Sequence, residues 1–149
     1  MQENYNLLLK QAESLIASET DIVAVTANLS ALLFNGLDRI NWLGFYFLRD
    51  SELVLGPFQG NVACTRIPVG QGVCGTAFKN NKTLIVDDVH LFRGHIACDA
   101  ASESEIVVPF SKGEIAGVLD VDSPQKSRFG EQESALLEAV VALLVNAKT

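Results

Sequence analysis

The chain has 149 residues, 48% hydrophobic and 19% charged, which is enough to bury the core of one domain and excludes disordered or collagen-like chains. Its formal net charge of −7, without a run of Lys or Arg, argues against binding to nucleic acid or to an anionic membrane surface. We find no apolar stretch of bilayer length and no basic segment typical of a signal peptide, so we expect a cytoplasmic protein.

Hydrophobic spacing predicts three main helices. Apolar residues recur at helical spacing over residues 4–17 and again over about 21–37, where Gly36 stands near the expected end. A third helix is predicted over about 130–147, with acidic residues in its first turn, where the helix dipole favours them. Helices are therefore expected at both ends of the chain.

The middle of the chain is predicted to form strands over residues 42–48, 52–58, 65–69, 84–89, 106–110 and 114–121. Residues 111–113, Ser-Lys-Gly, indicate a hairpin between the last two strands. Residues 70–79 are expected to form a turn and a short helix, and residues 90–104 a long loop of the kind that is often functional. This order predicts an α+β fold, a single domain over residues 1–149 with a central antiparallel sheet flanked by the N- and C-terminal helices.

Two acidic side chains share one face of the last predicted strand. Asp120 and Asp122 are two residues apart and so lie about 7 Å from each other along the strand. If Lys112 and Gly113 form a two-residue turn, Glu105 pairs with Asp120 on the neighbouring strand. Three carboxylates together require a cation, such as a substrate ammonium or a metal ion, or raised pKa values with shared protons. A solvated face at the end of the sheet explains the same pattern equally well.

Cysteine supplies the second group of candidate residues, Cys64, Cys74 and Cys98. An odd number does not suit a secreted disulfide framework, and in a reducing compartment such thiols are buried apolar residues, metal ligands or redox groups. Cys64 and Cys98 stand in polar loop sequences, where exposed, reactive thiols are expected. Cys74 lies in a glycine-rich segment and is expected to be a small buried residue.

Two other motifs indicate cofactor chemistry only weakly. His90 and His95 would be metal ligands together with Cys98 and the carboxylates, but no Cys-x2-Cys or His-x3-His pair accompanies them. Residues 70–75 match Gly-x-Gly-x-x-Gly, yet the preceding strand and the following helix are short for a dinucleotide site. We interpret this segment as a turn with close backbone packing.

An aromatic pair lies on the first predicted strand. Trp42 and Tyr46 are four residues apart and therefore share one face of that strand. They belong either to the core of the sheet or to an aromatic wall for a thioether or methyl-sulfoxide group. The composition alone does not separate these alternatives.

Six segments, taken together, resemble one known family: residues 41–46, 64–68, 70–75, 95–99, 104–109 and 117–123. Three cysteines at these spacings, with the two acidic motifs, resemble the free methionine-(R)-sulfoxide reductases, which are small single-domain enzymes with a GAF fold. The resemblance covers nearly the whole chain. It implies reduction of free L-methionine-(R)-sulfoxide to L-methionine, without a metal or an organic cofactor.

Roles for individual cysteines follow from this resemblance. Cys98 matches the family's nucleophile, Cys64 its resolving cysteine and Cys74 its third, less essential cysteine. Attack by Cys98 would leave a sulfenic acid, which Cys64 would convert to a disulfide for reduction by thioredoxin. The resemblance also suggests a homodimer.

The resemblance likewise implies a substrate pocket. Glu105, Asp120 and Asp122 match its acidic residues, and Trp42 and Tyr46 match its aromatic side. One carboxylic acid would donate a proton to the sulfoxide oxygen, and the others would hold the substrate ammonium. Two alternatives remain, a non-catalytic GAF module that senses a small ligand and a metal-dependent hydrolase that uses the acids and histidines.

Overall fold

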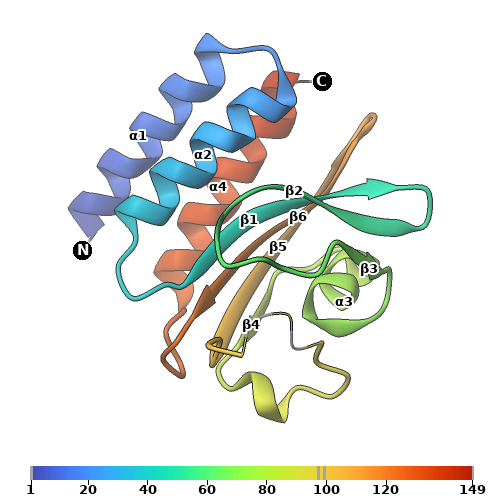
Figure 1. The fold of residues 1–149 in the computed structure, drawn as a ribbon. Coiled ribbons are helices and arrows are strands. Elements are labelled where there is room, and N and C mark those ends of the chain that lie inside the picture. Colours follow the sequence, from blue (N-terminus) through green and yellow to red (C-terminus); the bar gives the residue numbers. More distant parts are fainter. Residues whose placement is uncertain (1, 97, 99, 149) are drawn as a thin grey trace.

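The computed structural model describes residues 2–96, 98 and 100–148. Its elements, in chain order (Figure 1), are α1 (Gln2–Ser18), α2 (Ile22–Gly36), β1 (Trp42–Arg49), β2 (Glu52–Gly60), β3 (Arg66–Pro68), α3 (Gly72–Asn80), β4 (Leu84–Val86), the 3₁₀ helix η1 (Val89–Leu91), β5 (Ser104–Lys112), β6 (Ile115–Ser123) and α4 (Glu131–Lys148). Each predicted helix and strand is present. The predicted strand 84–89 is shorter than expected, because the chain leaves the sheet at Val86 and enters η1. No helix in the described part of the chain combines the length and apolar character needed to cross a bilayer.

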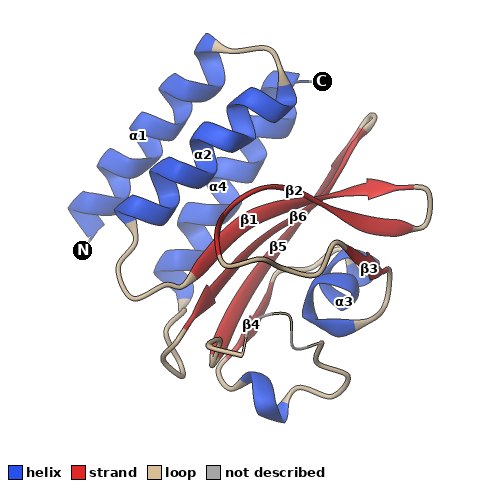
Figure 2. Ribbon diagram, in the orientation of Figure 1, coloured by secondary structure: helices blue, strands red, loops and turns tan. Residues whose placement is uncertain are grey.

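The six strands form one antiparallel sheet in the order β3-β2-β1-β6-β5-β4. Figure 2 shows the three long helices packed on one side of this sheet, with α3 and the segment around η1 on the other. The predicted α+β fold with a central antiparallel sheet is therefore confirmed. Side chains alternate across each strand, so every strand contributes to both sides.

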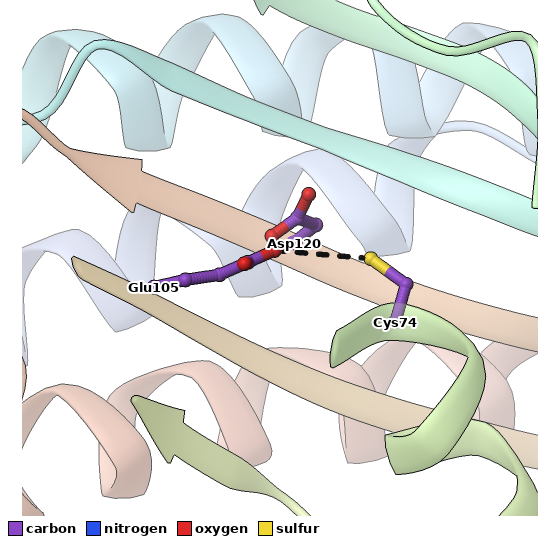
Figure 3. A group of neighbouring side chains, drawn as sticks. All are labelled: Cys74, Glu105 and Asp120. Atoms are coloured by element: carbon purple, nitrogen blue, oxygen red, sulfur yellow. Dashed lines mark hydrogen bonds between the residues drawn. The ribbon is translucent and has the colours of Figure 1, made fainter. Parts of the chain in front are cut away.

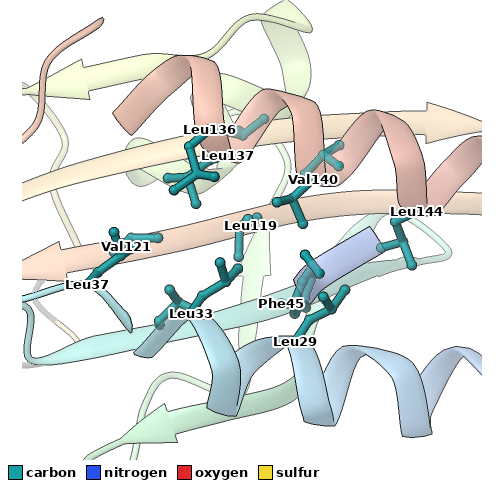
Figure 4. Packing of buried hydrophobic residues seen from close by; sticks show 14 of the residues in the cluster. Leu29, Leu33, Leu37, Phe45, Leu119, Val121, Leu136, Leu137, Val140 and Leu144 are labelled. Carbon is teal, nitrogen blue, oxygen red and sulfur yellow. The ribbon is translucent and has the colours of Figure 1, made fainter. Parts of the chain in front are cut away.

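The larger hydrophobic core lies between the sheet and the long helices (Figure 4). Leu29 and Leu33 from α2 and Leu137 and Leu144 from α4 are fully buried there against Phe45 of β1. Helix α2 starts after Asp21, whose carboxylate accepts hydrogen bonds from the backbone N–H groups of residues 23 and 24 at 2.9 and 3.0 Å. This core supports one face of the sheet, and the opposite face is covered by α3 and the loops.

The register of the β5–β6 hairpin differs from the predicted one by two residues. Lys112 pairs with Ile115, so the turn consists of Gly113 and Glu114 rather than Lys112 and Gly113. Gly113 has φ of +61°, a conformation that glycine adopts readily and other residues do not. Glu105 consequently stands opposite Asp122 and not opposite Asp120. The predicted face is unaffected, because a shift of two residues leaves every side chain on its own side of the sheet.

Candidate active site

Three carboxyl groups lie together on the sheet face that is turned away from the long helices. Glu105 comes from β5, and Asp120 and Asp122 come from β6. Their exposed fractions are only 7%, 6% and 8%, so the solvated face considered from the sequence is wrong. Helix α3, which contacts both strands, helps to cover this face. The alternation of side chains alone does not decide whether this face of the sheet is exposed to solvent. In the structure it is buried and forms a wall of the site.

Helix α3 directs a thiol at these carboxyl groups, as Figure 3 shows. The Cys74 sulfur lies 4.0 Å from Oε2 of Glu105. Cys74 is buried, as predicted, but its neighbours include carboxyl groups as well as apolar side chains. The glycine-rich segment packs closely against the end of β3, since a Cβ on Gly75 would lie 2.4 Å from the carbonyl oxygen of Pro68. Residues 70 and 71 therefore belong to a tightly packed turn, and residues 72–75 form the start of α3, in line with the turn and short helix expected from the sequence.

Burial and mutual repulsion determine the protonation of this group. Burial raises the pKa of Glu105 well above its usual value, and the charge of Asp120 raises it further. Burial, followed by the charge of Asp122, raises the pKa of Asp120 in the same way. Oδ1 of Asp120 is buried and has no hydrogen-bond partner among the described residues. The pKa of the Cys74 thiol is also raised, by burial first and by Asp120 next, so the thiol stays protonated at neutral pH.

A disulfide bond joins Cys64 to Cys98, with 5.3 Å between the Cα atoms. Cys64 lies in the segment between β2 and β3, and Cys98 lies in the long loop between η1 and β5. Both side chains are half-buried rather than exposed as expected, because each packs beside the cavity described below. The bond connects positions 34 residues apart, so it depends on the tertiary structure rather than on local sequence.

The aromatic pair of β1 forms another wall. Trp42 and Tyr46 are 2% and 1% exposed, and their ring centroids are 6.0 Å apart. The indole Nε1–H donates to the carbonyl oxygen of Asn61 at 3.0 Å, and the Tyr46 hydroxyl donates to the carbonyl oxygen of Cys64 at 2.8 Å. Burial and the nearby Asp120 raise the pKa of Tyr46, which therefore remains a neutral phenol. The rings are therefore buried core residues, as one alternative from the sequence states, and they also line a cavity.

All these groups lie around one small cavity that opens to solvent. Of the predicted residues, Trp42, Tyr46, Cys74, Cys98, Glu105, Asp120 and Asp122 line it directly. Cys64 adjoins it through the disulfide. Sequence reasoning did not select Ser102, which also lines the cavity and accepts a hydrogen bond from the Asn41 side-chain amide at 3.2 Å. Its position in a polar loop carried no signal.

The residues considered as metal ligands are only partly brought together in the described part of the chain. Among the described residues, one group of potential ligands is close enough for a metal ion, formed by Cys74, Glu105 and Asp120 with their ligand atoms within 4.8 Å. His90 is exposed and pairs with Glu103 at 3.1 Å, outside this group. The pKa of His95, which lines the cavity, is lowered by burial and by the charge of His90. The set considered from the sequence, two histidines with Cys98 and the carboxylates, is not brought together as one group among the described residues.

Comparison with known proteins agrees with this geometry. A family model described as "GAF domain" matches residues 17–147. The free methionine-R-sulfoxide reductase of Escherichia coli (strain K12) is 54% identical over 143 residues, which cover 95% of this chain and 87% of that protein. The chain belongs to the free methionine-R-sulfoxide reductase family.

Solved structures of free methionine-R-sulfoxide reductases have the same fold as this chain. The enzyme from Neisseria meningitidis, determined in complex with its substrate, superposes with a TM-score of 0.92 at 46% identity, covering 97% of this chain and 87% of that one. The reduced form of fRMsr from Staphylococcus aureus superposes with a TM-score of 0.93 at 54% identity, covering 98% and 96%. The sequence predicted a GAF domain and membership of this oxidoreductase family, and both predictions are confirmed.

Proposed function

We propose that residues 1–149 form one catalytic domain that reduces free L-methionine-(R)-sulfoxide to L-methionine. One observation carries the proposal: the Cys64–Cys98 disulfide lies beside a cavity whose wall holds three buried carboxyl groups. A redox-active thiol pair supplies two electrons, and buried carboxyl groups supply a proton and a site for an ammonium group. The activity named for the E. coli and N. meningitidis relatives supports the same assignment.

In the proposed first step, Cys98 is the nucleophile. Its thiolate attacks the sulfoxide sulfur, the sulfoxide oxygen passes to the Cys98 sulfur, and methionine leaves. The thiol sulfur is oxidised to a sulfenic acid while the sulfoxide is reduced to a thioether, so the electrons balance. A protonated carboxyl group among Glu105, Asp120 and Asp122 gives its proton to the oxygen, which makes the sulfur more electrophilic and completes the sulfenic acid. The raised pKa values of Glu105 and Asp120 keep such a proton available at neutral pH.

Recognition of the free amino acid is assigned to the remaining carboxylates. A substrate ammonium favours the ionised form of two of these carboxyl groups and so opposes the effect of burial, while the third group keeps its proton. A methionine sulfoxide within a peptide has an amide at that position and would leave a buried charge without its partner. Trp42 and Tyr46 line the cavity, and we place the methyl and thioether end of the substrate beside their rings.

Recycling requires a second thiol and an external reductant. We assign Cys64 as the resolving cysteine, which condenses with the sulfenic acid of Cys98, and Cys74 as an auxiliary thiol. A dithiol protein such as thioredoxin would reduce the disulfide, in the cytoplasm, where thiols are kept reduced. We also propose a homodimer, for which the family resemblance is the basis.

The test is turnover of a defined diastereomer. Pre-reduced purified protein should convert free methionine-(R)-sulfoxide, but not the S form, to methionine with dithiothreitol or thioredoxin. The Cys98→Ser variant should fold and have no activity. Binding of the sulfoxide without any turnover by the wild type would instead support the sensor alternative.

A burst experiment separates attack from resolution. Cys64→Ser protein should release about one methionine per chain without a reductant, because attack precedes disulfide formation. Its thioredoxin-linked cycling should collapse. Normal cycling in this variant would assign the resolving role to Cys74 or to an outside thiol.

A further inference from the structure

The aromatic side chains of β1 use their polar ends to hold the segment that carries Cys64. Nε1 of Trp42 lies 3.0 Å from the Asn61 carbonyl oxygen, and the Tyr46 hydroxyl lies 2.8 Å from the Cys64 carbonyl oxygen. Building on the proposed function, we propose that Trp42 and Tyr46 are positioning residues that hold the resolving thiol of Cys64 in place for disulfide formation. This role is separate from the substrate contact proposed above for their rings.

The chain needs such support because it leaves the sheet at this point. Strand β2 ends at Gly60, which has φ of +133° and passes so close to the indole that a Cβ would lie 2.6 Å from Cδ1 of Trp42. Residues 61–64 have no strand or helix assignment. Sheet-like backbone bonding resumes at Thr65, whose carbonyl oxygen accepts from the N–H of Leu55 at 3.0 Å. The two aromatic donors therefore hold the start and the end of the irregular segment.

The anchors themselves are rigid. Both rings are almost completely buried in the centre of the sheet, and the Trp42 ring also stacks on Phe58 with a centroid distance of 5.2 Å. Strand β1 pairs with β2 on one side and with β6 on the other, so it is a central strand. Because the pKa of Tyr46 is raised by burial and by Asp120, its hydroxyl remains a donor at neutral pH.

Cys98 is attached to the fold differently. It lies in the long connection between η1 and β5, where its own N–H donates to the carbonyl oxygen of Ile96 at 3.1 Å, a bond within the same loop. In the proposed mechanism, Cys98 reacts first with the sulfoxide and afterwards with Cys64. A fixed position for Cys64 raises the effective concentration of the second thiol and shortens the life of the sulfenic acid.

The step concerned is a simple condensation. The Cys64 thiol attacks the sulfur of the Cys98 sulfenic acid, the S–O bond breaks, the S–S bond forms, and the hydroxyl leaves as water with the thiol proton. The step is first order and follows methionine release. Its rate can therefore be separated from any effect of a substitution on substrate binding.

Tyr46→Phe removes the hydroxyl and keeps the ring, so it is the direct test. Pre-reduced variant is mixed with saturating sulfoxide without reductant, and methionine release, loss of free thiol and dimedone-trapped sulfenic acid are followed in time. We expect disulfide formation to be about tenfold slower than in the wild type, the effect of one hydrogen bond, with more sulfenic acid trapped. Tyr5→Phe is the matched control, since its buried hydroxyl donates at 2.7 Å to Glu133, far from the thiols in the sequence and outside the cavity lining.

The outcomes separate the inference from the function on which it rests. Disulfide formation at the wild-type rate in Tyr46→Phe, or equal slowing in Tyr5→Phe, overturns the positioning role. Absence of a methionine burst in the wild type overturns the proposed function itself. If Tyr46→Phe does not fold, Trp42→Phe tests the other hydrogen bond by the same time courses of methionine release, thiol loss and trapped sulfenic acid. Sulfenic acid that lasts longer in this variant than in the wild type supports the inference.

Discussion

Acetylating the amino group of the substrate should reveal what the buried carboxyl groups do. N-acetyl-methionine-(R)-sulfoxide has no ammonium to pair with Glu105, Asp120 and Asp122, which are each more than 90% buried. Leaving one partner of a buried ion pair alone costs about 3 to 5 kcal/mol. The carboxylate recovers part of this by taking up a proton, because its pKa is already raised by burial. A net loss of about 3 kcal/mol corresponds to a decrease of about a hundredfold in kcat/KM.

The assay compares kcat/KM for the free and acetylated substrates between pH 5 and pH 9. The ratio should grow as pH rises, because at low pH the carboxyl groups are protonated and the acetylated substrate leaves no charge unpaired. Asp122→Asn should reduce the ratio mainly through KM, whereas substitution of the proton donor, with Asp120→Asn as the candidate, should lower kcat. Glu114→Gln, in the exposed hairpin turn, is the control and should leave both substrates unaffected. Turnover of the acetylated substrate within threefold of the free amino acid would refute the ammonium site.

Three further predictions concern stability. Reducing the Cys64–Cys98 bond, which spans 34 residues, should lower the free energy of unfolding by up to about 4 kcal/mol, while Cys64→Ser protein should melt identically with and without reductant. Because burial raises the pKa of Glu105, this carboxyl group ionises in the unfolded chain before it does in the folded protein as pH rises above about 4. The free energy of unfolding should then fall by up to about 1.4 kcal/mol per pH unit for each such group. In urea titrations, Glu105→Gln should therefore show a weaker dependence of the unfolding free energy on pH. Gly117→Ala would place a Cβ 1.9 Å from the carbonyl oxygen of Tyr46, so urea unfolding should show a loss of about 3 kcal/mol; a loss below 0.5 kcal/mol would contradict the close approach of β1 and β6.

The features that the sequence predicted well depend on local periodicity. Apolar residues at helical spacing defined the long helices, and alternation placed Asp120 and Asp122 on one face with Glu105 on the neighbouring strand. That placement survived an error of two residues in the hairpin register, because side chains repeat every two residues along a strand. The turn itself was assigned wrongly. Gly113 supplies the positive φ at the first turn position, and Glu114 follows it.

The sequence alone thus determined which face of a helix or strand each candidate residue occupies. Its motifs also indicated the family to which the chain belongs. Whether the acidic face is wet or buried depended on α3 and the loops that cover it, which are brought there by long-range packing. The meeting of Cys64 with Cys98 across 34 residues, and the hydrogen bonds from Trp42 and Tyr46 to the segment before β3, likewise belong to the tertiary structure. Local patterns predict which side of a helix or strand a residue occupies. The burial of a side chain, its pKa and the pairing of thiols depend instead on neighbours that folding brings from elsewhere in the chain.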